Sequence, residues 1–167
     1  MASPTSLPAS FNVGDVLTAS QMNNLRGAFR ILQVVSATTT TQTQNNTNVM
    51  ADTTLTATIT PQSSASNVLV LVSQGGCAKL TGDATSHIVL QLVRGATVIS
   101  KIDDGGGYTN TNVINYFGTI STAYLDSPAT TSATTYKTQF RNNPNAAGVL
   151  VQGNSTRSTI TLLEVSA

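Results

Sequence analysis

The pentapeptide VLVLV, residues 68–72, decides the fold of this chain. Valine and leucine in unbroken succession favour a β-strand, and both faces of that strand are apolar. An apolar pattern on both faces is typical of a central strand that is covered on both sides. The turn-forming segment PQSSASN (61–67) precedes it, and the segment 53–60 before that turn alternates between apolar and polar residues. We therefore expect a β-sheet core built around residues 68–72.

Strand patterns recur on both sides of this core at regular spacing. Turns rich in Gly, Asn, Ser and Pro separate them, and no βαβ alternation is visible. The Thr-rich run SATTTTQTQNNTN (36–48) suits either an edge strand or a long polar loop. About eight strands in this arrangement predict an all-β fold, an antiparallel β-sandwich or jelly roll. The other predicted strands are 29–35, 53–60, 87–94, 97–101, 113–124, 136–141, 149–152 and 159–165.

The composition excludes several classes of protein. Only 9% of the 167 residues are charged, whereas a soluble domain usually carries roughly 25%. Thr, Ser, Asn and Gln supply the polar surface instead, which favours a chain that buries much of itself against copies or partners. The net charge is +1 with scattered basic residues, so we expect no nucleic-acid partner. No apolar run is long enough for a membrane helix, and we expect neither membrane insertion nor a signal peptide.

Residues for catalysis are scarce. The lone histidine, His87, has no neighbouring metal-ligand spacing and is predicted to be a residue of a strand edge or interface. Cys77, the only cysteine, is predicted to be a small buried apolar residue. We therefore expect no enzyme activity, no metal and no cofactor.

The segment DDGGGYTNTN (103–112) is the longest predicted loop. It lacks the spacing of an EF-hand and of a phosphate-binding loop. It suits either an ordinary flexible hairpin or a loop that contacts a receptor or glycan. In the second case the contacting residues would be Asp103, Asp104, Tyr108, Asn110 and Asn112.

The N-terminal region has a different character. Residues 1–15 read as an extended arm, and VLTASQMNNLRG (16–27) reads as a short helix of about two and a half turns. Thr18 and Gln21 form a capping box, and Gly27 ends the helix. A helix this short needs a surface to pack on, and we predict that it packs through Leu17, Met22, Leu25 and Phe29. We therefore divide the chain into an arm with a helix (1–28) and a β-domain (29–167).

Five segments resemble proteins of tailed bacteriophages. FNVGDVLTASQMNNLRGAF (11–29) is similar to a segment that opens many virion proteins of such phages. The remaining four are similar to phage and prophage proteins described as tail-fibre-like or minor structural proteins. They are ILQVVSATTTT (31–41), ITPQSSASNVLVLVS (59–73), LDSPATTSATTYKTQFR (125–141) and STITLLEVSA (158–167).

This resemblance implies a β-sandwich, a homotrimer and attachment to the particle through the N-terminal part. It implies assembly into the virion in the host cytoplasm and no active-site residues. Two locations stay open. The chain could decorate the capsid as a cement protein or head fibre, or it could sit on the tail and bind a host receptor. Its short length favours decoration. A carbohydrate-binding module that uses the loop at 103–112 is a further alternative.

Overall fold

The computed structural model describes residues 14, 16, 30–144 and 146–166. Within them the chain forms ten strands and one 3-10 turn, η1 (Gly153–Ser155). The predicted helix, with Leu17, Met22, Leu25 and Phe29, lies outside the described residues and stays a prediction. All strand pairs are antiparallel. The strands are β1 (Ile31–Thr39), β2 (Thr43–Asn45), β3 (Ala51–Ile59), β4 (Asn67–Lys79), β5 (His87–Arg94), β6 (Thr97–Gly106), β7 (Asn115–Asp126), β8 (Thr134–Asn143), β9 (Val149–Val151) and β10 (Ser158–Val165).

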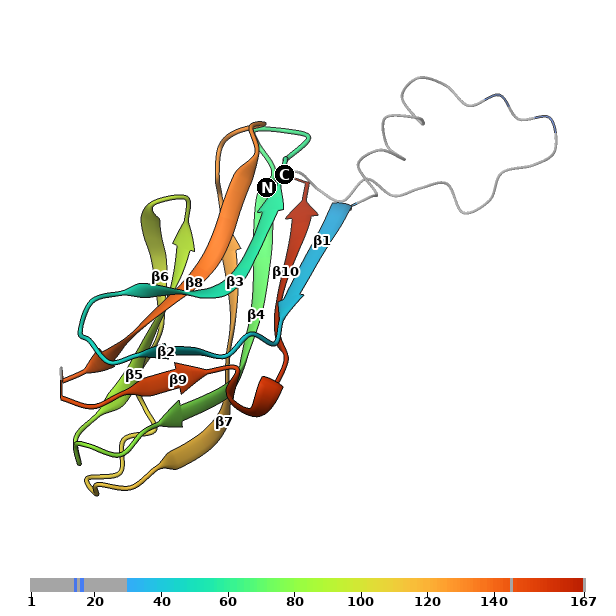
Figure 1. Ribbon diagram of the computed structural model, residues 1–167. Coiled ribbons are helices and arrows are strands. Elements are labelled where there is room, and N and C mark those ends of the chain that lie inside the picture. The colour runs from blue at the N-terminus through green and yellow to red at the C-terminus, as the bar shows by residue number, and fades with distance from the viewer. Residues whose placement is uncertain (1–13, 15, 17–29, 145, 167) are drawn as a thin grey trace.

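The eight long strands form two packed sheets, β1-β10-β4-β7 and β3-β8-β5-β6 (Figure 1). Their pairs are nested: β5 with β6, β4 with β7, β3 with β8 and β1 with β10. The first half of the chain thus runs as an antiparallel ribbon against the second half, folded about the tight turn between β5 and β6. This strand order is that of a jelly roll. It confirms the predicted all-β sandwich. Two short strands accompany the eight long ones: β9, which was predicted at 149–152, and β2, which lies in the Thr-rich run.

The two short strands, β2 and β9, complete the first sheet at one end. β10 pairs with the first half of β4, and β9 takes its place beside the last two residues of β4. Two glycines allow this exchange. A Cβ on Gly75 would lie 2.6 Å from the carbonyl oxygen of Arg157, and one on Gly76 would lie 2.5 Å from the backbone nitrogen of Gly153. The chain around η1 can approach β4 this closely because neither glycine has a side chain.

Buried apolar side chains form two clusters between the sheets. The alternation that the sequence shows on β3, β5 and β8 sets which side chains point inward. Cys77 is fully buried, as predicted, and burial raises the pKa of its thiol to about 12. One cluster holds Leu55, Ala57, Ile59, Val68, Val70, Val72, Leu92, Tyr136, Ile160 and Leu162. The other holds Cys77, Ile88, Leu90, Phe140, Val149 and Val151.

A buried polar chain crosses the sandwich where β4 passes from one cluster to the other. The Thr138 hydroxyl of β8 donates to the Gln74 side-chain oxygen of β4 at 2.9 Å. The Gln74 amide donates to the Ser158 hydroxyl of β10 at 3.1 Å, and all three residues are fully buried. Their partners are therefore in the protein, as buried polar groups require.

The strand at 68–72 is central, but only one of its faces is covered within the described chain. Val68, Val70 and Val72 point into the core and are buried. Leu71 points outward and is 39% exposed, and Leu69 is half-buried. The expectation of a strand covered on both sides is therefore wrong for this domain alone.

Two loop predictions also need correction. The loop at 103–112 begins only after Gly106, because Asp103 and Asp104 belong to β6 and pair with Leu90 and Val89 of β5. The Thr-rich run at 36–48 is neither one strand nor one loop. Its first part extends β1 to Thr39 beside β10, and its second part forms β2 beside β9. In both cases a neighbouring strand supplies hydrogen bonds that local sequence does not reveal.

Glu164 of β10 forms hydrogen bonds with β1 and with the turn between β3 and β4. These contacts lie at the end of the sandwich where the described chain starts. Its carboxylate accepts hydrogen bonds from the Gln33 side chain at 2.6 Å and from the Gln62 amide at 2.8 Å. Burial by itself would raise the pKa of this carboxyl group. The hydrogen bonds outweigh burial and hold the pKa below its ordinary value of 4.5.

We expect this carboxylate to make the fold acid-sensitive. A depressed pKa means that the folded state favours the ionised form, so its stabilising contribution is present above about pH 4.5 and is lost as the pH falls through the lower folded-state pKa. Urea unfolding at pH 7 and pH 3 of the natural protein and of Glu164→Gln checks this. The stability gap between the two proteins should be large at pH 7 and should shrink at pH 3. An equal difference in stability between the two proteins at pH 7 and pH 3 would contradict the acid sensitivity expected from Glu164.

Candidate functional site

The best candidate for a binding site is the loop cluster at one end of the sandwich. The last residue of β4, Lys79, pairs with the starts of β7 and β9, and the first residue of β5 lies opposite the last residue of β8. The segments 80–86, 107–114 and 146–148 therefore meet at this end, which we call the distal end (Figure 1). The described chain starts and finishes at the opposite, proximal end, where the Ser166 amide donates to the Arg30 carbonyl at 2.8 Å.

Lys79 positions two of these loops. Its side chain is fully buried, and its ammonium group donates to the carbonyls of Ala84 at 2.7 Å and Thr111 at 2.7 Å. It also donates to the Thr109 hydroxyl at 2.9 Å. The ion pairs found among the described residues do not include Lys79. One buried cation thus joins the loop 80–86 to the loop 107–114 through neutral oxygen atoms.

The predicted contact residues of the loop 107–114 sit on this support. Tyr108 is 51% exposed, and its ring lies edge-on to the ring of His87 with 6.0 Å between ring centroids. Asn112 accepts a hydrogen bond from the Gly82 amide at 2.6 Å, which ties the two loops a second time. Asn110 is exposed and has a positive φ of 54°. The structure therefore brings Tyr108 and Asn112 together with the neighbouring loop and leaves Asn110 at the surface.

His87 is held between backbone and side-chain partners. Its Nδ1 lies 2.8 Å from the Thr85 carbonyl, and its Nε2 lies 3.0 Å from the Asn143 side-chain nitrogen. A neutral ring with its proton on Nδ1 satisfies both partners, since Nδ1 then donates and Nε2 accepts. His87 thus lies at the start of a strand, as predicted, and supports the ring of Tyr108.

The two aspartates of the predicted loop lie elsewhere on this end. Asp104 is on β6, where it pairs with Lys101 at 2.7 Å, and its Oδ1 lies 3.7 Å from His87 Nε2. The hydrogen bond from Lys101 lowers the pKa of Asp104. Asp103 is the next residue toward the middle of the strand. Neither aspartate belongs to the loop tip with Tyr108, because β6 continues to Gly106.

A pocket of about 380 Å³ opens beside these loops. Its lining mixes side-chain amides with apolar groups, a combination that suits a neutral polar ligand better than an ion. Three exposed side chains of the β6–β7 region add apolar surface, namely Val113, Ile114 and Tyr116. No cluster of metal-binding side chains occurs among the residues that the structure describes. The described lining is Gln44, Asn46, Leu80, Thr81, Gly82, Ile114, Ala146, Ala147 and Gly148.

Sequence reasoning did not find Lys79, the His87–Tyr108 contact or the pocket. The only local signal for Lys79 is a charged residue at the end of an otherwise uncharged strand, GGCAK. The contact and the pocket join residues far apart in the chain, so no local pattern marks them.

Fold and site together define a jelly-roll domain with a loop-built surface at one end. Viral capsid domains, lectins and cupins share this architecture, and the fold alone does not choose among their functions. No helix of the described residues is long and apolar enough to cross a membrane.

No protein-family model matches the chain, and no curated protein matches it. Among solved structures, the VP2 subviral particle of infectious bursal disease virus is similar over 82% of this chain, with 14% sequence identity and a TM-score of 0.44. The match covers 38% of the VP2 chain. A similarity this weak adds nothing to the fold assignment, which rests on the strand order described above.

Proposed function

We propose that this protein is a structural component of a tailed-bacteriophage virion, a homotrimer that decorates the capsid as a cement protein or head fibre. The observation that carries this proposal is that the N-terminal segment and the loop cluster lie at opposite ends of the domain. Residue 30, through which the N-terminal segment enters, lies at the proximal end, and the loop cluster around Tyr108 lies at the distal end. A protein anchored through residues 1–28 would thus hold its loop cluster away from the particle.

Two further properties support this proposal. The first is the resemblance of five segments of the sequence to phage structural proteins, which is an expectation of the sequence alone. The chain is also poor in charge, with 9% charged residues, whereas a soluble domain usually carries roughly 25%. Such a composition favours burial against copies or partners, as expected of a subunit in a larger assembly.

Deleting residues 1–28 is the direct test of anchoring. We expect the truncated protein to be absent from purified particles, because the attachment segment is gone while the jelly roll is intact. Quantitative immunoblotting of particles assembled with each protein measures the occupancy. The matched control is Tyr108→Ala in the full chain, which changes the distal end and should join particles at normal occupancy. Normal occupancy of the truncated protein would overturn the anchoring role.

The second candidate is host attachment from the tail or binding of a glycan. The exposed Tyr108 favours it, because an exposed aromatic ring can stack on a sugar, and the loop cluster that carries Tyr108 also borders a pocket with side-chain amides in its lining. Antibody-gold labelling of intact particles separates the two functions. Gold over the head supports decoration, and a phage without the protein should then have a less stable capsid and normal adsorption. Gold confined to the tail supports attachment, and Tyr108→Ala should then weaken adsorption.

A further inference from the structure

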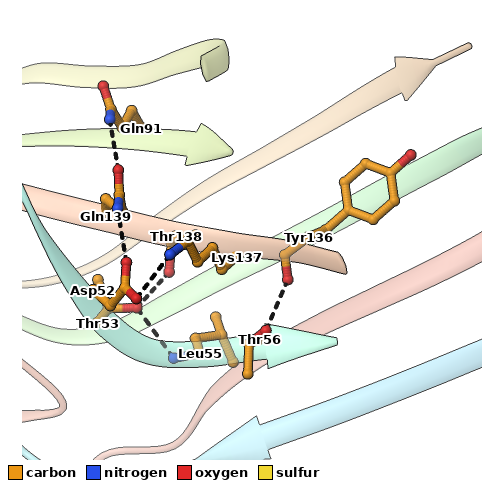
Figure 2. Close-up of polar contacts among 9 residues, drawn as sticks. All are labelled: Asp52, Thr53, Leu55, Thr56, Gln91, Tyr136, Lys137, Thr138 and Gln139. Atoms are coloured by element: carbon orange, nitrogen blue, oxygen red, sulfur yellow. Dashed lines mark hydrogen bonds and ion pairs between the residues drawn. The ribbon is translucent and has the colours of Figure 1, made fainter. Parts of the chain in front are cut away.

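The outer faces of the two sheets differ in chemistry. On the sheet β3-β8-β5-β6, polar side chains pair with one another across three strands (Figure 2). Asp52 accepts from Lys137 at 2.8 Å and from Gln139 at 2.7 Å, and Gln139 in turn accepts from Gln91 at 3.0 Å. This face is suited to water, because its polar groups are exposed or paired.

The outer face of the sheet β1-β10-β4-β7 carries an apolar row instead. Val34 lies opposite Leu163, Leu163 opposite Leu69, and Leu69 opposite Leu125. The two ends of the row are open to solvent, since Val34 is 57% and Leu125 is 58% exposed. The row therefore runs across all four strands. We use the name apolar patch for this row together with four neighbouring residues, Ile31, Val165, Leu71 and Ala123.

The apolar patch is confined to the proximal half of the sheet. On the distal side of Leu71 and Ala123, the next outward residues are Ser73 on β4 and Ser121 on β7, which face each other. On β1 and β10 the change comes one row earlier, where Ser36 lies opposite Thr161 in the row of Leu71, and it continues where Thr38 lies opposite Thr159. None of the outward residues named in these rows is charged. The face thus changes from apolar to hydroxyl-rich with distance from the point where residue 30 enters.

We infer that residues 17–29 of this chain dock on the apolar patch. They join the described chain at Arg30, directly before Ile31 of the patch, and the Ser166 amide holds the Arg30 carbonyl at 2.8 Å. The segment carries the predicted apolar stripe Leu17, Met22, Leu25 and Phe29, and Arg26 is its only charged residue. The apolar stripe and the apolar patch therefore match in chemistry and adjoin in sequence.

The dimensions agree as well. A helix of about two and a half turns is roughly 14 Å long and about 10 Å wide. The apolar rows extend over about five residues, or roughly 16 Å along the strands, and four strands span roughly 14 Å. Gly27 provides a place for the chain to reverse between the helix and β1. Docking would leave residues 1–16 to reach the particle, but the inference itself does not depend on the proposed function.

A fluorescent reporter tests the docking in the full-length isolated protein. The chain has no tryptophan, so Met22→Trp introduces a single reporter on the predicted stripe. We expect blue-shifted emission that is protected from a soluble quencher and unchanged on dilution. Adding Leu125→Lys should shift the emission to that of an exposed indole, because a charge would then sit in the patch. Val34→Lys, on another strand of the patch, should do the same.

The matched control is Val98→Lys, which places the same charge on the other sheet at a residue that is 53% exposed. It should leave the emission blue-shifted. Circular dichroism of each variant confirms that the jelly roll is folded. Exposed emission without any lysine substitution would overturn the inference, as would emission insensitive to both patch variants. A blue shift lost on dilution, in step with dissociation of an oligomer seen by light scattering, would assign the patch to a second copy instead.

Discussion

Replacing Asp126 with alanine is expected to destabilise the domain by roughly 3 kcal/mol. Asp126 is nearly buried at the proximal end, where its carboxylate accepts from the Tyr136 hydroxyl at 2.6 Å. It also accepts from Arg94 at 2.8 Å and 2.9 Å. Burial and the adjacent carboxylate raise the pKa of Tyr136, so its hydroxyl keeps its proton and remains a donor. Because β7 lies in one sheet and β5 and β8 in the other, these contacts join the two sheets.

The loss is large because two partners are left without their acceptor. The Tyr136 hydroxyl belongs to a fully buried residue and cannot turn to water, whereas Arg94 is partly exposed and can recover some hydration. An unpaired buried donor costs about 1–3 kcal/mol by itself. Chemical denaturation monitored by circular dichroism measures the change.

The control for this prediction is Asp104→Ala. It removes an aspartate with a comparable ion pair, Lys101–Asp104 at 2.7 Å, whose side chains are 62% and 39% exposed. A surface pair of this kind contributes about 0–1 kcal/mol, so the variant should unfold nearly as the natural protein does. If both variants lost the same free energy of unfolding, the contacts of Asp126 between the sheets would not contribute the stability expected of them.

Replacing Lys79 with alanine is expected to loosen the distal loops and to lower the free energy of unfolding by about 2–4 kcal/mol. The substitution leaves the carbonyls of Ala84 and Thr111 and the Thr109 hydroxyl without their buried donor. It also empties the space of a fully buried side chain, which adds a cavity cost. Both effects act on the loops that carry Tyr108 and Asn112.

Hydrogen exchange can locate this effect. The amides of Tyr108 and Gly82 donate within the loop cluster, to Gly105 and to Asn112. We expect both to exchange much faster in Lys79→Ala, while amides of β1 and β10 keep slow exchange relative to global unfolding. Lys79→Met separates packing from hydrogen bonding, because it refills the space without the donors. It should restore much of the stability but not the protection of the loop amides.

Lys101→Ala is the control, since Lys101 is an exposed lysine in the middle of β6. It should change neither the loop amides nor global stability by a measurable amount. Unchanged protection of Tyr108 and Gly82 in Lys79→Ala would contradict the positioning role of Lys79.

Local sequence determined the strands and the class of the fold. The alternation over 53–60, 87–94 and 136–141 predicted which side chains point inward, because the two faces of a strand alternate with every residue. Turn residues predicted where most strands end. The isolation of Cys77 and His87 indicated that neither is part of a recognisable chemical motif.

Tertiary structure decided what depends on register between distant strands. It continued β6 through Asp104 and divided the Thr-rich run between two partners, because a neighbouring strand supplies backbone hydrogen bonds that local propensity does not encode. It buried Lys79 against two loops, and it left Leu71 of VLVLV exposed and Leu69 half-buried. Sequence alone showed that this strand has two apolar faces. Only the packing of the sheets decided that one face forms the core and the other the apolar patch.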